Sequence, residues 1–170
     1  MGNKQFQLKK LSPTDGKDIY EMLQEMPADE NGFENKFKGL SFEEYKEKLK
    51  LKDSNSRGEN LPEGYVAATF FWLYFNGKPV GVSKLRHELT DHLRKYGGHI
   101  GYGIRPKERG KGYATKMLEL TLEEAKKLGL RKVLITCNPD NIGSQRVAEK
   151  NGGILKEKTE ETWYYWVDLN

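Results

Sequence analysis

Hydrophobic residues near the N-terminus first alternate with polar ones and then follow a helical spacing. The alternation over residues 5–10 predicts a short strand. Ser12 and Pro13 come next, and they are typical of a helix N-cap and a first helical position. The apolar positions after them are three and four residues apart, at Ile19, Met22, Leu23 and Met26. This spacing predicts an amphipathic helix that ends at Pro27.

A capping box, Ser41-Phe-Glu-Glu44, predicts a second helix, because its serine and glutamate can exchange side-chain-to-backbone hydrogen bonds. The apolar stripe on this helix is narrow and consists of Phe42, Tyr45 and Leu49. Residues 28–39 and 52–64 on either side are rich in turn formers and charges. We therefore expect a short helix between two irregular surface segments.

The strongest strand pattern lies in the middle of the chain. Two β-rich runs, over residues 65–75 and 78–86, are separated only by Asn76-Gly77. Both residues of this dipeptide accept the positive φ angles of a type I′ turn, so they predict a tight antiparallel hairpin. Residues 87–98 break the pattern and end in Gly-Gly, and we expect a loop or a short helix there.

A strand predicted from residue 99 onward has one bulky face and one nearly bare face. The bulky residues are Ile100, Tyr102 and Ile104, and they alternate with His99, Gly101 and Gly103. Pro106 ends this strand, and a helix from about Ala114 to Leu128 is followed by an apolar strand over 132–137. The order strand, helix, strand predicts two parallel strands with a right-handed crossover.

The C-terminal part of the chain predicts one more helix and a closing hairpin. Asn141 can cap a helix that runs to about Lys150, and the hairpin strands are expected over 153–158 and 162–169. The whole pattern predicts an α+β fold in a single domain of residues 1–170. Its central sheet is expected to be mixed, mostly antiparallel, with one βαβ unit.

Composition and charge limit the partners that we expect. Hydrophobic residues make up 36% of the chain, which is enough for a folded core. The net charge of +4 is small and mixed in sign, so we expect no nucleic-acid partner. The longest apolar run, over 65–75, is much shorter than the ~20 residues that span a bilayer, and the N-terminus has no apolar signal segment. Together with a single cysteine, Cys137, these features predict a cytoplasmic protein without a membrane partner.

Two glycines and several basic residues stand where the helix after residue 104 begins. Amide N–H groups at a helix N-terminus lack intrahelical partners and favour an anion. Gly110 and Gly112 allow successive amides to turn inward with no Cβ in the way. The basic residues around them are Arg105, Lys107, Arg109, Lys111 and Lys116. The segment therefore predicts a site for a pyrophosphate group.

The spacing of the glycines shows which of the known phosphate-binding loops the chain could contain. A nucleotide-triphosphate loop requires G-x-x-x-x-G-K-[ST], which the chain does not contain. The dinucleotide fingerprint G-x-G-x-x-G is half present, because Thr115 stands at the place of the third glycine. A nicotinamide-binding domain would also normally open the chain and repeat its βαβ units. A dinucleotide-binding redox domain remains a rival interpretation.

A third pattern fits the loop better. Arg109-Gly-Lys-Gly112-Tyr-Ala114 matches R-x-x-G-x-[GA], and with the strand before it the segment resembles the acetyl-CoA loop of the GNAT superfamily of N-acetyltransferases. The order of predicted elements is similar to that fold across nearly the whole chain, and residues 97–153 look like one bacterial group of predicted acetyltransferases. The resemblance implies transfer of an acetyl group from acetyl-CoA to a primary amine of a small-molecule or peptidic acceptor, by direct attack.

The resemblance also implies which residues hold the cofactor. The implied cofactor-binding residues are Ile104, Arg105, Arg109, Gly110, Lys111, Gly112, Tyr113, Ala114, Thr115, Asn141 and Ser144. It further implies that the Tyr102 N–H polarises the acetyl carbonyl. His99, on the same strand, is our first candidate for the base that takes the proton of the amine, although strand histidines more often serve a structural role. We expect no metal site, since His87 and His92 have no cysteine nearby.

The sequence departs from the family at one place. Ala148 stands where many members carry a tyrosine that can protonate the departing thiolate, and Gly153 replaces a usual phenylalanine. The tyrosine acid therefore cannot be transferred to this chain, and a non-catalytic acyl-CoA-binding module stays open as an alternative. Exposed strand edges also make a homodimer a further expectation.

Overall fold

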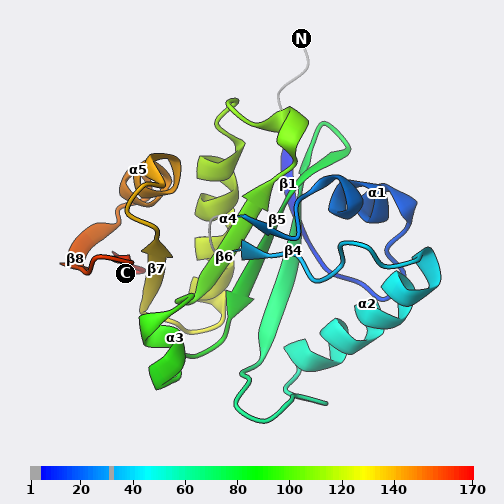
Figure 1. Cartoon of the computed structure of the whole chain (residues 1–170), viewed down its shortest axis with the longest axis horizontal. Coiled ribbons are helices and arrows are strands. Elements are labelled where there is room, and N and C mark those ends of the chain that lie inside the picture. Colours follow the sequence, from blue (N-terminus) through cyan, green and yellow to red (C-terminus); the bar gives the residue numbers. More distant parts are fainter. Residues whose placement is uncertain (1–4, 31–32) are drawn as a thin grey trace.

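A four-stranded antiparallel sheet forms the centre of the protein in the computed structural model, which describes residues 5–30 and 33–170 (Figure 1). The strands lie in the order β1-β4-β5-β6 and comprise β1 (Phe6–Lys10), β4 (Ala68–Phe75), β5 (Lys78–Arg86) and β6 (Ile100–Ile104). β4 has an inner position and is buried along almost its whole length. This burial explains why its sequence, ATFFWLYF, is nearly continuous in apolar residues.

Helices pack on both faces of this sheet (Figure 1). They are α1 (Lys17–Glu25) and α2 (Phe42–Ser56) on one face and α4 (Tyr113–Lys127) on the other. On the first face, Ile19 of α1 and Tyr45 of α2 pack in one cluster with Trp72 of β4, and all three are fully buried. On the second face, Met117 of α4 packs with Leu73 of β4. The apolar stripes predicted from the sequence are therefore the stripes that face the sheet.

A second antiparallel sheet of three strands follows α4 in the chain. Its order is β7-β9-β8, and its strands are β7 (Lys132–Cys137), β8 (Ile154–Lys158) and β9 (Trp163–Asp168). Helix α5 (Ile142–Lys150) connects β7 to β8. The remaining elements are β2 (Asp29–Glu30), β3 (Phe33–Glu34), α3 (Asp91–Lys95) and the 3-10 turn η1 (Pro106–Glu108). The α+β class predicted from the sequence is confirmed.

The strands β6 and β7 belong to different sheets, so the continuous mixed sheet that the sequence predicted is not formed. They meet where the His99 backbone N–H donates to the Leu134 carbonyl at 2.8 Å. The Leu134 N–H, which could have extended a ladder, donates to the His99 side chain at 2.9 Å. β7 instead pairs along its whole length with β9, and every ladder among the described residues is antiparallel. The order β6, α4, β7 is present as predicted, but its two strands diverge.

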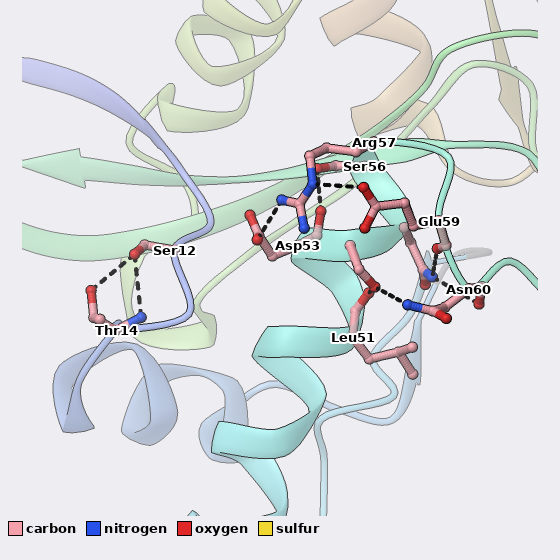
Figure 2. A network of polar contacts seen from close by, with 10 residues as sticks. Ser12, Thr14, Leu51, Asp53, Ser56, Arg57, Glu59 and Asn60 are labelled. Carbon is pink, nitrogen blue, oxygen red and sulfur yellow. Dashed lines mark hydrogen bonds and ion pairs between the residues drawn. The ribbon is translucent and has the colours of Figure 1, made fainter.

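The first two helices have boundaries that differ from those predicted. α1 begins at Lys17 with Gly16 at its N-cap, whereas the predicted cap Ser12 lies in a preceding turn, where its hydroxyl is 2.9 Å from that of Thr14 (Figure 2). α2 continues to Ser56, into the segment predicted as a loop. Its last turn is held by the Arg57 guanidinium, which donates to Asp53 at 2.6 Å and to Glu59 at 3.4 Å (Figure 2). The charged residues that suggested a loop therefore stabilise a helix end.

Other predicted features are confirmed. Asn76 and Gly77 have φ angles of 49° and 81°, as a type I′ turn requires. The Asn141 side chain caps α5 by accepting from the Ser144 N–H at 3.1 Å. The prediction that segment 28–39 is irregular, however, is wrong in part, because β2 and β3 pair there as antiparallel strands. None of the helices in the described ranges is long and apolar enough to cross a membrane.

Candidate active site

The glycine loop ends in a row of backbone N–H groups with no partner in the described part of the chain. α4 begins at Tyr113, and Gly112 at its N-cap offers no side chain to the first turn. The N–H groups of residues 110–115 donate to no other described residue. Gly110 and Gly112 have φ angles of 77° and 81°, and a Cβ on either would meet no atom within 4 Å. The glycines are therefore required by the backbone conformation, and the space beside them is open to a ligand.

The two arginines of the loop are held by acidic residues from the N-terminal part of the chain. Arg109 donates to both carboxylate oxygens of Glu30, at 2.6 and 2.7 Å. Arg105 donates to both oxygens of Glu25, at 2.5 and 2.6 Å, and this pairing lowers the pKa of the Glu25 carboxyl. Such forked pairs fix the position of both side chains. The arginines thus connect the loop to the chain segment around β2.

Glu108 neutralises much of the remaining charge at the loop. Its carboxylate accepts from Lys111 at 2.8 Å and from Lys78 at 3.1 Å, and the two lysines lower the pKa of the Glu108 carboxyl. Because Arg105, Arg109, Lys78 and Lys111 are already paired with carboxylates, the unpartnered N–H groups of residues 110–115 are the groups of the loop left free to receive an anion.

β6 has a free edge that faces the gap between the sheets. The Arg105 N–H donates to the Val80 carbonyl at 2.7 Å, which marks a hydrogen-bonded position of the β5–β6 ladder. These positions alternate along an antiparallel strand, so the N–H of Tyr102 and the carbonyl of Ile104 point away from β5. The Ile104 carbonyl indeed accepts from Arg109 Nε at 3.2 Å. The Tyr102 N–H is thus oriented toward the gap.

Tyr102 and Ser144 bring the two halves of the fold together across this gap. Their hydroxyl oxygens are 2.8 Å apart. Burial raises the pKa of the Tyr102 hydroxyl well above its ordinary value, so it is protonated at neutral pH. The Cys137 thiol donates to Ser144 Oγ at 3.4 Å, and burial raises its pKa too. Asn141, Ser144 and Tyr102 all line one cleft, so these three predicted site residues are brought together.

The first residues of α4 contribute backbone rather than side chains to the loop. The Tyr113 ring is buried and packs against Phe75 and Phe6, with ring centres 4.8 and 5.5 Å away. Ala114 packs at the edge of the same cluster, and the Thr115 carbonyl accepts from the Asn151 side chain at 3.2 Å. These three predicted residues could therefore bind an anion through their N–H groups.

His99 lies outside the cleft. Its side chain is buried, with 5% exposure, and Nδ1 accepts from the Leu134 N–H at 2.9 Å. Burial lowers the pKa of the imidazole to about 4, and the charges of Arg94 and Arg86 act in the same direction. Because one ring nitrogen is occupied and His99 does not line the cleft, this geometry favours a structural role over that of a base.

Ala148 is fully buried and does not line the cleft. It packs in the same cluster as Cys137 and Tyr165, beneath the surface that Ser144 and Val147 present. A tyrosine side chain would need space that this packing does not leave. The small side chain of Ala148 is therefore part of the core packing around α5.

The cleft has a volume of about 770 Å³ and runs between the two sheets and under the α1–α2 side of the fold. One end is lined by Ile104, Arg109 and Asn141, next to the glycine loop. The other end is lined by residues of the segments that the sequence suggested for the acceptor, including Phe37, Lys52, Tyr65 and Tyr96. One continuous space thus reaches from the loop to these variable segments.

The bare face of β6 is partly covered from the opposite side. A Cβ on Gly103 would lie 2.9 Å from the Met26 side chain, and one on Gly101 would lie 3.4 Å from Phe33. Gly103 therefore allows a close approach of Met26, a packing role that the sequence did not reveal. Met26, Phe33 and both glycines all line the cleft.

Sequence reasoning missed a group of basic side chains at the far end of the cleft. Lys84 and Arg86 of β5 and Lys52 of α2 all line this space. Burial lowers the pKa of Lys84 to about 7, and the charges of Arg86, Lys52 and Lys36 act in the same direction. The sequence did contain a sign of this group. In KPVGVSKLR, Lys84 and Arg86 follow Val82 at intervals of two residues, so they lie on the same strand face as this buried valine.

No group of three or more His, Cys, Asp or Glu side chains in the described ranges is arranged to hold a metal ion.

The sequence of this chain matches the family model of the GNAT acetyltransferase domain over residues 5–154. A cleft between two diverging sheets, with unpartnered amides at a helix start near one end, is an arrangement that can accommodate an acyl-CoA donor. This chain belongs to the GNAT acetyltransferase family.

Individual relatives agree with this assignment. The uncharacterized N-acetyltransferase YnaD of Bacillus subtilis is 36% identical over 97 residues, which are 48% of this chain and 57% of that protein. The ribosomal-protein-S5-alanine acetyltransferase of Vibrio fischeri has a similar structure, with a TM-score of 0.71 and 17% identity over 100% of this chain and 96% of that chain. The N-acetyltransferase PseH of Campylobacter jejuni, solved with acetyl coenzyme A, has a TM-score of 0.63 and 12% identity over 98% of this chain and 100% of that chain. The fold is therefore the GNAT fold.

Proposed function

We propose that this protein transfers an acetyl group from acetyl-CoA to a primary amine of a small-molecule or peptidic acceptor. The observation that carries the proposal is the row of unpartnered N–H groups at residues 110–115, which stands at the head of α4 beside the free edge of β6. Membership of the GNAT family supports the same reaction.

The cofactor fits this site by its chemistry. The N–H groups of residues 110–115 would hold the pyrophosphate of acetyl-CoA, since they are unpaired and lie at the positive end of the α4 dipole. The free edge of β6 near Tyr102 and Ile104 offers backbone groups to an extended pantetheine chain. Asn141 and Ser144 line the other wall of the cleft and would contact the cofactor from α5.

The residues around Tyr102 would serve the transfer step. Bound acetyl-CoA supplies a thioester, whose carbonyl carbon forms the new bond to the amine nitrogen while the carbon–sulfur bond breaks. The Tyr102 N–H would hold the negative charge that develops on the carbonyl oxygen. The Tyr102 and Ser144 hydroxyls, 2.8 Å apart, stay protonated and would stabilise the departing thiolate by donating a hydrogen bond. The amine would release its proton to solvent.

A turnover experiment tests the proposal. The protein is mixed with acetyl-CoA and a broad panel of primary amines, and the release of free CoA thiol is followed. We expect release above the amine-free rate with at least one class of amine. Calorimetric titrations with acetyl-CoA and with NAD are run in parallel. Binding of NAD without binding of acetyl-CoA would contradict the proposal and favour a redox domain.

A second function is favoured by one observation. Ala148 is buried at the position of the usual tyrosine acid, so the chain could bind acyl-CoA without catalysis. Acetyl-CoA binding with no thiol release across the whole amine panel would support this binding module. A cytoplasmic location, a homodimer, and a single domain over residues 1–170 without nucleic-acid or membrane partners stay predictions.

A further inference from the structure

We propose that the amine acceptor carries a carboxylate or phosphate group, which binds between Lys52, Lys84 and Arg86 at the end of the cleft farther from the glycine loop. This inference rests on the proposed N-acetyltransferase function and adds the chemical class of the substrate. We refer to these three residues as the basic wall.

The basic wall consists of cations without acidic partners. In residues 5–30 and 33–170, neither Lys52 nor Lys84 forms an ion pair or donates a hydrogen bond, although both are partly buried. Arg86 donates to the Gly97 and Gly98 carbonyls, at 3.3 and 3.1 Å, and has no carboxylate partner. At the other end of the cleft, by contrast, Arg109 is paired with Glu30. The basic wall is thus the part of the cleft where positive charge is left uncompensated.

The cations lie close to one another. The ammonium groups of Lys84 and Lys52 approach the same Phe70 ring, 5.6 and 6.0 Å from its centre. Lys36, at the rim of the cleft, is paired with Glu34 at 3.6 Å, but both side chains are largely exposed, so this pair is weak. Glu34 is the acidic residue whose charge acts on both Lys84 and Arg86. One exposed carboxylate does not balance three partly buried cations.

The clustering of partly buried cations is unfavourable in the absence of an opposite charge, which indicates an anionic ligand. Burial and mutual repulsion both disfavour the charged form of Lys84, as the lowering of its pKa to about 7 shows. A bound carboxylate or phosphate would reverse both effects, because it supplies the missing opposite charge next to partly buried cations. A cationic acceptor such as a polyamine would instead add to the repulsion.

The position of the basic wall suits an acceptor that reacts beside Tyr102. Lys84 stands opposite Gly101 in the β5–β6 ladder, and the glycine loop follows Ile104 at the other end of β6. Gly101 and Ile104 are three steps apart along the strand, or about 10 Å, and the glycine loop lies beyond Ile104. Gly101 carries no side chain, and the Phe33 ring lies over it, 3.4 Å from the place of a Cβ, so the Lys84 side chain lines the cleft beside this ring. An acceptor held by its anion at the basic wall would place its amine between the wall and the loop.

Binding to the protein saturated with CoA tests the inference without any acetyl transfer. Calorimetry compares amines that carry an anion with neutral counterparts that lack it, in two arms. The carboxylate arm uses β-alanine against propylamine and γ-aminobutyrate against butylamine. The phosphate arm uses glucosamine 6-phosphate against glucosamine and phosphoethanolamine against ethanolamine. We expect at least one anionic member to bind more tightly than its counterpart by about tenfold or more, and the arm in which it occurs identifies the anion.

Variants connect this preference to the basic wall. Lys84→Met and Lys84→Gln should each reduce the preference for the anionic amine by about tenfold, while the affinity for CoA stays unchanged and shows that the fold is intact. Lys50→Met is the matched control, since Lys50 is an exposed lysine two residues before Lys52 on the same helix, and it should bind as the unmodified protein does.

Two outcomes are kept apart. If CoA itself does not bind, the proposed function fails and the inference falls with it. If CoA binds but anionic and neutral amines bind equally, or neither binds at millimolar concentration, the basic wall is not an anion site. An anionic preference that survives in both Lys84 variants would overturn the assignment as well.

Discussion

The imidazole of His99 joins the two sheets where they are closest. Its Nδ1 accepts from the Leu134 N–H, and the His99 backbone N–H donates to the Leu134 carbonyl, so two hydrogen bonds hold β6 and β7 together at this point. Nδ1 can accept only while it carries no proton. The neutral ring is therefore part of the contact from which the strands begin to diverge.

Replacing His99 should change stability rather than catalysis. We expect His99→Ala to lower the free energy of unfolding by about 3 kcal/mol, because it leaves the buried Leu134 N–H unpaired and opens a cavity. His99→Asn, whose Oδ1 can take the place of Nδ1, should recover part of this loss. Denaturant unfolding measures the stability, and kcat is compared for the folded variants. A loss of kcat of about a hundredfold or more in folded His99→Asn would instead assign the base to His99.

The same group should make the protein sensitive to acid. The pKa of His99 is about 4 in the folded state and about 6.5 when unfolded, so the unfolded chain binds more protons between these values. The stability due to the neutral ring is fully present above pH 6.5 and is lost as the pH falls toward 4, by up to about 3 kcal/mol. Unfolding curves across this range should therefore fall less steeply for His99→Asn than for the unmodified protein. Parallel curves would mean that His99 is not held neutral.

At the scale of elements, the start of α4 presents backbone N–H groups rather than side chains to the open space beside it. Gly112 holds a left-handed conformation, with φ of 81°, and turns the chain so that residues 110–115 leave their N–H groups free. A β-branched residue at this position strongly disfavours a positive φ. The loop would then be forced into another conformation, although nothing within 4 Å opposes a Cβ sterically.

Gly112→Val should therefore weaken the binding of acetyl-CoA by at least about tenfold while the circular dichroism spectrum stays that of the folded protein. Gly129→Val is the matched control. Gly129 follows the same helix at its other end, also with a positive φ, of 96°, and with no atom within 4 Å of a Cβ. The control should suffer a similar backbone strain but bind acetyl-CoA normally. Equal affinities for the two variants in calorimetry would mean that the loop does not hold the cofactor.

Local sequence patterns predicted most of the elements because their causes are local. The Asn76-Gly77 turn, the Ser41–Glu44 capping box and the Asn141 cap all depend on residues within a few positions of one another. The start of α1 was missed because Ser12 bonds to Thr14 in a preceding turn, so Gly16 takes the N-cap position. Propensity alone does not show which of two nearby residues begins a helix.

The arrangement of the site depended on contacts that no local pattern contains. Arg109 and Glu30 are 79 residues apart in sequence, so the loss of positive charge at the loop was not visible from the chain. The basic wall likewise combines Lys52 of α2 with two residues of β5. Where β6 and β7 part, the Leu134 N–H donates to the His99 side chain, a contact between residues 35 positions apart. The conformation of the glycine loop, by contrast, could be predicted, because the positive φ angles of Gly110 and Gly112 and the helix start at Tyr113 depend on consecutive residues.

At the scale of the whole molecule, two antiparallel sheets meet at one point and diverge from it (Figure 1). The gap leads into a cleft with the glycine loop at one end and the basic wall at the other, and Tyr102 lies between them on β6. In the function that we propose, acetyl-CoA occupies the end at the glycine loop and the acceptor occupies the end at the basic wall. This proposal depends above all on binding of acetyl-CoA by the free amides at the start of α4.

Hydrogen exchange of individual amides measures this claim directly. Exchange is followed at residues 110–115 with and without saturating acetyl-CoA, and with NAD for comparison. The account predicts that acetyl-CoA slows exchange at these amides and at Tyr102, because each gains an acceptor, whereas NAD leaves them unchanged. Unchanged exchange at residues 110–115 in the protein saturated with acetyl-CoA, or equal protection by NAD, would contradict it.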